Sequence, residues 1–174
     1  ENRGLEYMFV MMNAARFSVG VQGIGVAERA YQRAVDYARQ RVQSRPVDGS
    51  LNAAAPIIHH PDVRRMLMTM KALTQAARVI CYMTANAIDL SHRLKDPEAR
   101  QAAGERAGLL TPVAKAFATD IGSDVASLGV QIHGGIGISN ELAVGHYFKR
   151  STMIESQFGS VDHHLRRYER LAIG

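Results

Sequence analysis

The chain has 174 residues, a common size for one compact domain, and we expect residues 1–174 to fold as a single unit. Hydrophobic residues make up 47% of the chain and charged residues 21%, a globular composition that excludes a disordered or collagen-like protein. No apolar stretch has the length of a membrane span. The net charge of +5 is spread along the chain without interleaved aromatic residues, so nucleic-acid binding is not expected.

The single cysteine bears on the cellular compartment of the protein, and the first residues bear on whether the chain is a piece of a longer one. A single cysteine, Cys81, cannot form an internal disulfide, which fits a reducing compartment and predicts a cytoplasmic protein. Its place on an apolar helical stripe favours a small core residue over a nucleophile. The chain opens with Glu1-Asn2-Arg3, without an initiator methionine or an apolar leader, so we expect a piece of a longer protein.

The first predicted element is a long amphipathic helix from Val10 to about Ala38. Gly20, Gly23 and Gly25 lower the helix propensity inside it, and they predict close approach of a neighbouring backbone or cofactor. A glycine-rich phosphate loop is the weaker interpretation, because that motif needs a preceding strand and both flanks are helical here. The apolar stripe consists of Val10, Ala14, Phe17, Val21, Ile24, Ala27, Tyr31, Ala34 and Ala38.

A loop and two more long helices follow. The interval from Pro46 to Pro61 predicts a loop, and Pro61 suits the first turn of a helix that reaches about Ser91. Asp96-Pro97-Glu98 has the composition of a helix start, and Thr111-Pro112 predicts an N-cap followed by proline at the first position of a third long helix. The apolar stripe of the second helix consists of Val63, Leu67, Met70, Ala77, Cys81, Thr84 and Ile88.

Shorter helices complete the predicted fold. A fourth helix starts near Ser139 or Asn140 and reaches about Thr152, and a last short helix runs from Gly159 to Leu171. No segment shows sustained alternation of apolar and polar residues, so no sheet is expected. The pattern predicts an all-α fold, namely an antiparallel four-helix bundle.

Two parts of the chain have residues that bind metals or ligands in other proteins. The pairs His59-His60 and His163-His164 lack further ligands at a recognised spacing, so no metal site is expected. The segment from Gln131 to Gly137 ends an apolar helix with three glycines, which leave backbone N–H groups and space for a phosphate or carbonyl. A simple glycine C-cap is the alternative interpretation, and it accounts for one glycine better than for three.

Taken in order, these segments resemble the C-terminal helical domain of the acyl-CoA dehydrogenases. The resemblance covers almost the entire chain and implies the last domain of a three-domain flavoprotein. That protein would pack into a homo-oligomer, a dimer or tetramer, with FAD at the subunit interface. The matching residues are Arg16, Gly25 to Ala30, Tyr37 to Arg41, Gln131 to Gly137 and Glu141.

The resemblance implies roles for particular residues. Arg41 matches the arginine that reaches the FAD pyrophosphate, in keeping with the fit of a guanidinium to phosphate oxygens. Pro61 stands where many members have an FAD-contacting glutamine, and Ser44 stands where they have a phenylalanine. The segment that would cradle the same cofactor consists of Gln131, Ile132, His133, Gly134 and Gly135.

The implied reaction is oxidation of an acyl-CoA to the trans-2-enoyl-CoA in fatty acid metabolism, with electrons passing to an electron-transfer flavoprotein. It needs a carboxylate base within hydrogen-bond reach of the substrate α-hydrogen. The usual positions of this base are occupied here by Phe158 and Ala15, and Glu155 is the candidate for a displaced base. A surface or capping carboxylate is the alternative role for Glu155.

Two other functions stay open. The tail around Gly145 to Arg150 resembles small subunits of heteromeric acyl-CoA dehydrogenases, such as the pimeloyl-CoA type, which implies a non-catalytic FAD-binding partner subunit. A cofactor-free helical oligomerisation module is the other alternative. In each case we expect dimers or higher oligomers.

Overall fold

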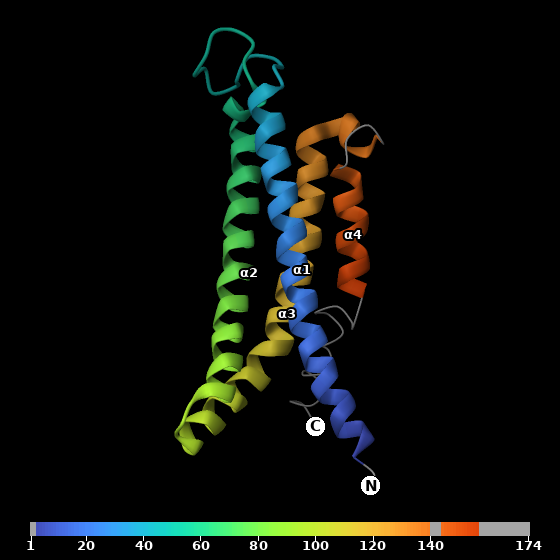
Figure 1. The fold of residues 1–174 in the computed structure, drawn as a ribbon. Coiled ribbons are helices and arrows are strands. Elements are labelled where there is room, and N and C mark those ends of the chain that lie inside the picture. Colours follow the sequence, from blue (N-terminus) through green and yellow to red (C-terminus); the bar gives the residue numbers. More distant parts are fainter. Residues whose placement is uncertain (1–2, 140–143, 157–174) are drawn as a thin grey trace, which may run out of the picture.

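The computed structural model describes residues 3–139 and 144–156, which form a bundle of α-helices (Figure 1). The helices are α1 (Gly4–Gln40), α2 (Pro61–Arg93), α3 (Pro97–His133) and α4 (Val144–Ser156), with short 3-10 helices η1 (Ile57–His59) and η2 (Gly134–Ile138). No strand occurs in these ranges, where an isolated bridge joins Val42 to Pro56. The predicted antiparallel four-helix bundle is therefore confirmed.

The third long helix begins earlier than we predicted. α3 passes through Thr111 and Pro112 without a break, so the predicted N-cap at Thr111 is wrong. The Thr111 hydroxyl instead donates to the Ala107 carbonyl at 2.7 Å, one turn back in the same helix. Pro112 has no N–H to donate a backbone hydrogen bond within the helix. Figure 1 shows α3 changing direction in its yellow part, as expected for an internal proline.

The start of α3 is the one that Asp96-Pro97-Glu98 predicts. The Asp96 carboxylate accepts hydrogen bonds from the backbone N–H groups of Glu98 and Ala99, at 3.2 and 3.3 Å. Pro97 then occupies the first turn, where its missing N–H costs no helical hydrogen bond. At the other end of α3, Gly134 has a φ of 62° and caps the helix.

Glycines bring α1 and α3 into close contact. A Cβ added at Gly23 would lie 2.5 Å from the Ala118 carbonyl oxygen, and one added at Gly20 would lie 3.2 Å from the Ala114 carbonyl oxygen. The predicted close approach of a neighbouring backbone is confirmed at these two positions. It is wrong at Gly25, where a Cβ would meet nothing within 4 Å, because that residue faces away from α3.

The core consists of small side chains on α1, the predicted stripe of α2 and apolar side chains of α3. Val10 and Val21 are 67% and 46% exposed, so the predicted stripe of α1 is wrong at these positions. Burial on α1 begins at Val19, since the first turns extend beyond the part of the bundle that α2 and α3 cover (Figure 1). Four alanines on α1 are completely buried, namely Ala27, Ala30, Ala34 and Ala38.

Cys81 belongs to this core, as predicted. It is 2% exposed on α2, and burial raises the pKa of its thiol. In the ranges that the model describes, no helix is long and apolar enough to cross a membrane. The last predicted helix, from Gly159 to Leu171, lies outside the described residues.

Candidate functional site

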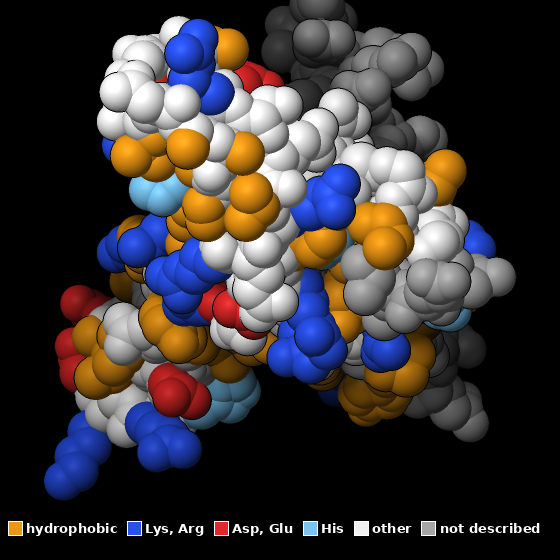
Figure 2. Space-filling view, turned by 90° about the horizontal axis from the view of Figure 1, so that it is seen from above, with side chains coloured by type: hydrophobic (Ala, Val, Ile, Leu, Met, Phe, Trp, Pro, Cys, Tyr) orange, Lys and Arg blue, Asp and Glu red, His pale blue; other side chains and the backbone are white. Residues whose placement is uncertain are grey.

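Arg41 and the end of α3 line one pocket, at the end of the bundle where α1 passes into its loop. The pocket has a volume of about 370 Å³. Figure 2 looks onto this end of the molecule and shows Lys and Arg side chains interspersed with hydrophobic ones. The lining residues are Tyr37, Arg41, Gln43, Ser44, Ile57, His60, Val63, Gln131, Ile132, His133 and Gly134.

Backbone hydrogen bonds fix the position of Arg41. Its N–H donates to the Tyr37 carbonyl at 2.9 Å, which completes the last turn of α1. Its carbonyl accepts from the N–H of Ile57 at 2.8 Å, on the far side of the loop. The His60 Nε2 donates to the Gln43 carbonyl at 2.8 Å, so the base of the loop is tied to the start of α2. These hydrogen bonds therefore fix the backbone of Arg41, whereas its side chain is exposed.

His133 forms the buried wall of the pocket. The residue is 5% exposed, and its Nδ1 donates to the Gly129 carbonyl at 2.7 Å. Its ring stacks on Tyr37 with 4.4 Å between centroids and 26° between planes. Burial lowers the pKa of His133 and the charge of Arg33 lowers it further, against the opposing effect of the Gly129 hydrogen bond. A neutral imidazole at pH 7 follows, with Nε2 left as an acceptor.

The three glycines after α3 have different environments. The N–H of Gly134 donates to the carbonyls of Gln131 and Val130, so this N–H is engaged in capping rather than free for a ligand. A Cβ at Gly137 would lie 2.7 Å from the Val130 carbonyl oxygen, which explains that glycine by packing. Gly135 is exposed, and a Cβ there would meet nothing within 4 Å. The C-cap alternative thus accounts for Gly134, and packing accounts for Gly137, but neither requires a glycine at position 135.

The chemistry of the lining suits an anion. Arg41 is the only permanently charged side chain among the lining residues, and no Asp or Glu lines the pocket. Within the described part of the chain, neither the Arg41 guanidinium nor the Gln131 amide has a hydrogen bond or ion pair to another side chain. A guanidinium and an amide beside a bare Gly134 Cα can bind a phosphate or pyrophosphate without rearrangement of the surrounding contacts.

Some predicted residues lie elsewhere. Gly135 and Pro61 do not line the pocket, whereas Ser44 does. Ala15 lies half-buried on α1, far along the helix from Arg41. The structure gives no geometry for the proposed base, because the side chain of Glu155 and all of Phe158 lie outside the described residues. Glu141, which belongs to the family resemblance, lies outside them as well.

His60 and Gln43 are among the lining residues that were not predicted. His60 was considered only for a metal site, and Gln43 gave no signal because its contribution depends on the hydrogen bond from His60. Among the described residues no group of three His, Cys, Asp or Glu side chains could hold a metal ion. The His59-His60 pair has a different role in the structure, since His60 braces the loop and His59 is exposed on η1.

Comparison with known proteins identifies the family. A family model described as acyl-CoA dehydrogenase, C-terminal domain, matches residues 2–171, and the chain belongs to this family. A 3-methylmercaptopropionyl-CoA dehydrogenase of Ruegeria pomeroyi is 51% identical over 154 residues, which cover 88% of this chain and 26% of the relative. A butyryl-CoA dehydrogenase of Syntrophomonas wolfei is 33% identical over 141 residues, covering 81% of this chain and 23% of the relative. The chain thus spans about a quarter of these relatives.

Solved structures agree on the fold. An acyl-CoA dehydrogenase of Bacillus anthracis in complex with FAD matches with a TM-score of 0.76 at 26% identity, over 91% of this chain and 27% of that one. The butyryl-CoA dehydrogenase of Megasphaera elsdenii matches with a TM-score of 0.75 at 24% identity, over 100% of this chain and 40% of that one. The bundle described above is the fold that these chains share.

Proposed function

We propose that this chain is the C-terminal domain of a longer, cytoplasmic, FAD-dependent acyl-CoA dehydrogenase that forms a trans-2-enoyl-CoA. The observation that carries the proposal is the meeting of Arg41 with Gln131 and Gly134 in one pocket that has no acidic lining. Arg41 is far from the other two residues in the sequence, and only the folded bundle brings them together. The FAD-containing relative from Bacillus anthracis supports the choice of cofactor.

The residues of the pocket have separate parts in holding FAD. Arg41 would pair with the pyrophosphate, and Gln131 would donate an amide hydrogen bond beside it. The bare Cα of Gly134 lets the phosphate oxygens approach, and the stack of His133 on Tyr37 keeps that turn in place. When bound, FAD supplies the acceptor for the hydride that leaves the substrate β-carbon.

For the substrate, we infer a short acyl-CoA. The relative with 51% identity is named for 3-methylmercaptopropionyl-CoA and the one with 33% identity for butyryl-CoA, and both names denote short acyl chains. The proposed electron acceptor is an electron-transfer flavoprotein. Apolar side chains are exposed on the first turns of α1, which supports a homo-oligomer and further domains that cover this surface. These side chains are Leu5, Tyr7, Phe9 and Met11, which are 48–66% exposed.

The catalytic base in this proposal is Glu155 on α4. Ala15 has no titratable group and Phe158 has none either, so neither usual position supplies the base in this chain. Glu155→Gln in the longer protein should abolish flavin reduction while FAD stays bound. Glu141→Gln is the control, because it removes another carboxylate from the C-terminal part of the sequence. If both variants reduce flavin at the unaltered rate, the base is elsewhere.

An anaerobic titration tests the proposal as a whole. The longer protein that carries this chain should contain FAD, and its flavin absorbance should bleach with 3-methylmercaptopropionyl-CoA or butyryl-CoA. Arg41→Ala should weaken FAD binding by at least about tenfold, because a charged hydrogen bond to a phosphate is lost. Arg106→Ala, an exposed cation on α3, should leave FAD binding unchanged.

The same measurement separates the two alternatives. A bound flavin that bleaches only when a second subunit is added would favour a non-catalytic FAD-binding partner of a heteromeric dehydrogenase. A protein without flavin, whose assembly but not absorbance responds to Arg41→Ala and Gln131→Ala, would favour a cofactor-free oligomerisation module.

A further inference from the structure

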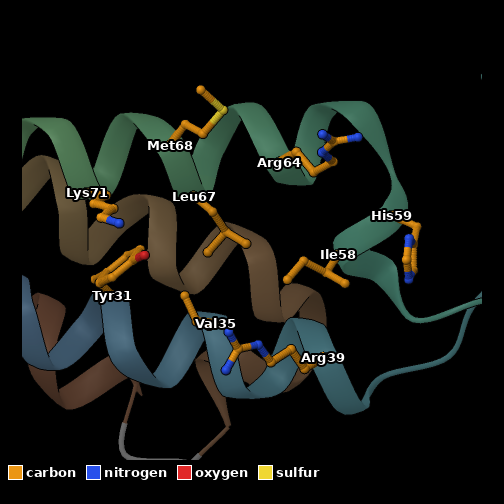
Figure 3. A pocket seen from close by; sticks show the side chains of 9 residues that line it. All are labelled: Tyr31, Val35, Arg39, Ile58, His59, Arg64, Leu67, Met68 and Lys71. Atoms are coloured by element: carbon orange, nitrogen blue, oxygen red, sulfur yellow. The ribbon is translucent and has the colours of Figure 1, made fainter.

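A second pocket lies between α1 and α2 and shares no lining residue with the Arg41 pocket (Figure 3). Its volume is about 620 Å³, within the range of sites for small ligands. The lining residues come from three turns of α1, from η1 and from the first turns of α2. They are Tyr31, Val35, Arg39, Ile58, His59, Arg64, Leu67, Met68 and Lys71.

The floor of this pocket is apolar. Leu67 is 8% exposed, and Figure 3 shows its side chain directed into the space between the helices, opposite Val35 and beside the Tyr31 ring. Ile58 extends into the same space from η1 (Figure 3). Such a surface can pack against a planar or apolar ligand body, and the half-buried Tyr31 ring adds an aromatic edge.

The sides of this pocket are cationic. Arg39 approaches from α1 and Lys71 from α2, while Arg64 lies on the rim, and no acidic residue lines the pocket. Within the described residues, Arg39 and Lys71 have neither a hydrogen bond nor an ion pair. Arg64 is different, because its charge acts on the exposed Asp48 carboxylate in the loop. Two cations without partners thus lie near opposite ends of the apolar floor, and each is free to bind an anionic group.

From this arrangement we propose that the pocket binds a small phosphorylated organic molecule. Its phosphate would pair with Arg39 or with Lys71, and its ring or apolar part would lie between these cations, on Leu67 and Tyr31. The α1 segment from Tyr31 to Arg39 is about 12 Å long, which suits a nucleotide-sized ligand. An acidic helix from a partner protein would need cations over several more turns than this pocket offers.

The test is equilibrium dialysis of the chain against ADP, adenosine and inorganic phosphate. All proteins in it carry Arg41→Ala, which weakens phosphate binding in the other pocket equally throughout the series. ADP should bind at one site per chain, more tightly than adenosine or phosphate alone. Arg39→Ala with Lys71→Ala should weaken ADP binding at least about tenfold. Lys95→Ala with Arg106→Ala removes the same charge at the far end of α2 and α3 and should have no effect.

Several results would overturn the proposal. It fails if ADP shows no saturable binding, or if the control pair weakens binding as much as the Arg39 and Lys71 pair. Equal affinities for phosphate and ADP would rule out a role for the apolar floor. Binding of anionic phospholipid vesicles that depends on Arg39 and Lys71, without ADP binding, would assign the cations to a membrane surface instead. Since Arg41 is absent from every protein tested, differences among these proteins report on the pocket of Arg39 and Lys71 and not on the Arg41 pocket.

Discussion

Gly23 on α1 lies against the backbone of Ala118 on α3, so closely that a Cβ at position 23 would be 2.5 Å from the Ala118 carbonyl oxygen. The contact is made by backbone on both sides, because Gly122 lies next to it with its own Cβ position 3.1 Å from the Gly23 carbonyl oxygen. The distance between α1 and α3 is therefore set by the absence of side chains at this crossing. Both helices that form the Arg41 pocket depend on it, since the pocket lies between their C-terminal ends.

The first prediction concerns this crossing. Gly23→Ala should destabilise the chain by roughly 1–3 kcal/mol, since neither backbone can move away without separating the helices. Gly25→Ala is the matched control, two residues along the same helix with open space around its Cβ position. It should stabilise the chain by up to about 1 kcal/mol through helix propensity. Urea unfolding followed by circular dichroism measures both, and equal effects would contradict the role of the crossing.

The second prediction concerns the pH dependence of stability. His133 has a pKa lowered below its ordinary value of 6.5, first by burial, so the unfolded chain takes up a proton there before the folded chain does. The stabilisation by neutral His133 is complete above pH 6.5 and decreases as the pH falls towards the folded-state value. The decrease attributable to this residue cannot exceed about 1.4 kcal/mol per pH unit.

Two variants separate this effect from that of other histidines. His133→Gln should reduce the loss of stability between pH 7 and 5, although it lowers stability at pH 7 by removing the stack on Tyr37. His59→Gln is the control, because it replaces an exposed histidine outside the stack on Tyr37. An NMR titration in which the His133 ring protonates above pH 6.5 would contradict the prediction.

How far the sequence predicts the fold is clear from individual elements. The three-and-four spacing locates α2 to within two residues of its end, because its buried face continues without interruption from Met66 to Ala87. At Thr111-Pro112 the same signals mislead, since the Thr111 hydroxyl can bond within the helix as well as cap it. Gly25 misleads in a similar way, because periodicity does not reveal which of three nearby glycines faces the neighbouring helix.

The candidate site is predictable to a lesser degree. Arg41 and Gln131 follow from the family resemblance together with their chemistry, and the fold places both in one pocket. The contribution of His60 depends on a loop closure between residues that are seventeen positions apart, and no local pattern encodes it. The basic pocket at Arg39 and Lys71 depends on the register between α1 and α2, which only the folded bundle fixes.

The third prediction concerns the start of α3. Asp96→Ala should destabilise the chain by about 1 kcal/mol, because two N–H groups lose their acceptor. Asp96→Asn should retain most of that stability, since its side-chain oxygen can cap the same groups. Asp89→Ala serves as control, because it removes an exposed carboxylate near the C-terminal end of α2 and should be neutral or slightly stabilising. Thermal unfolding of the four proteins at one pH provides the comparison.

The last prediction concerns the ion pair that joins α1 to α2. Arg78 Nη2 lies 2.8 Å from Glu28 Oε2, and the two side chains are 28% and 29% exposed. Gln32 donates a second hydrogen bond to the same carboxylate at 2.9 Å. Burial alone would raise the pKa of Glu28, but the hydrogen bonds from Arg78 and Gln32 and the charge of Arg78 lower it overall. The pair therefore stabilises the fold at pH values above 4.5, the ordinary pKa of a glutamate side chain. That contribution is lost as the pH falls through the lowered pKa of Glu28 in the folded chain.

A double-mutant cycle with Glu28→Gln and Arg78→Met should give a coupling of roughly 0.5–1 kcal/mol at pH 7. The exposed pair Asp62 and Arg65 is the control, because its side chains are 70% and 64% exposed and solvent screens their attraction. Its coupling should be smaller, and it should decrease more steeply with salt. Equal couplings for the two pairs would show that partial burial gives Glu28 and Arg78 no advantage. A coupling between them that persists at pH 3 would contradict an ionic origin.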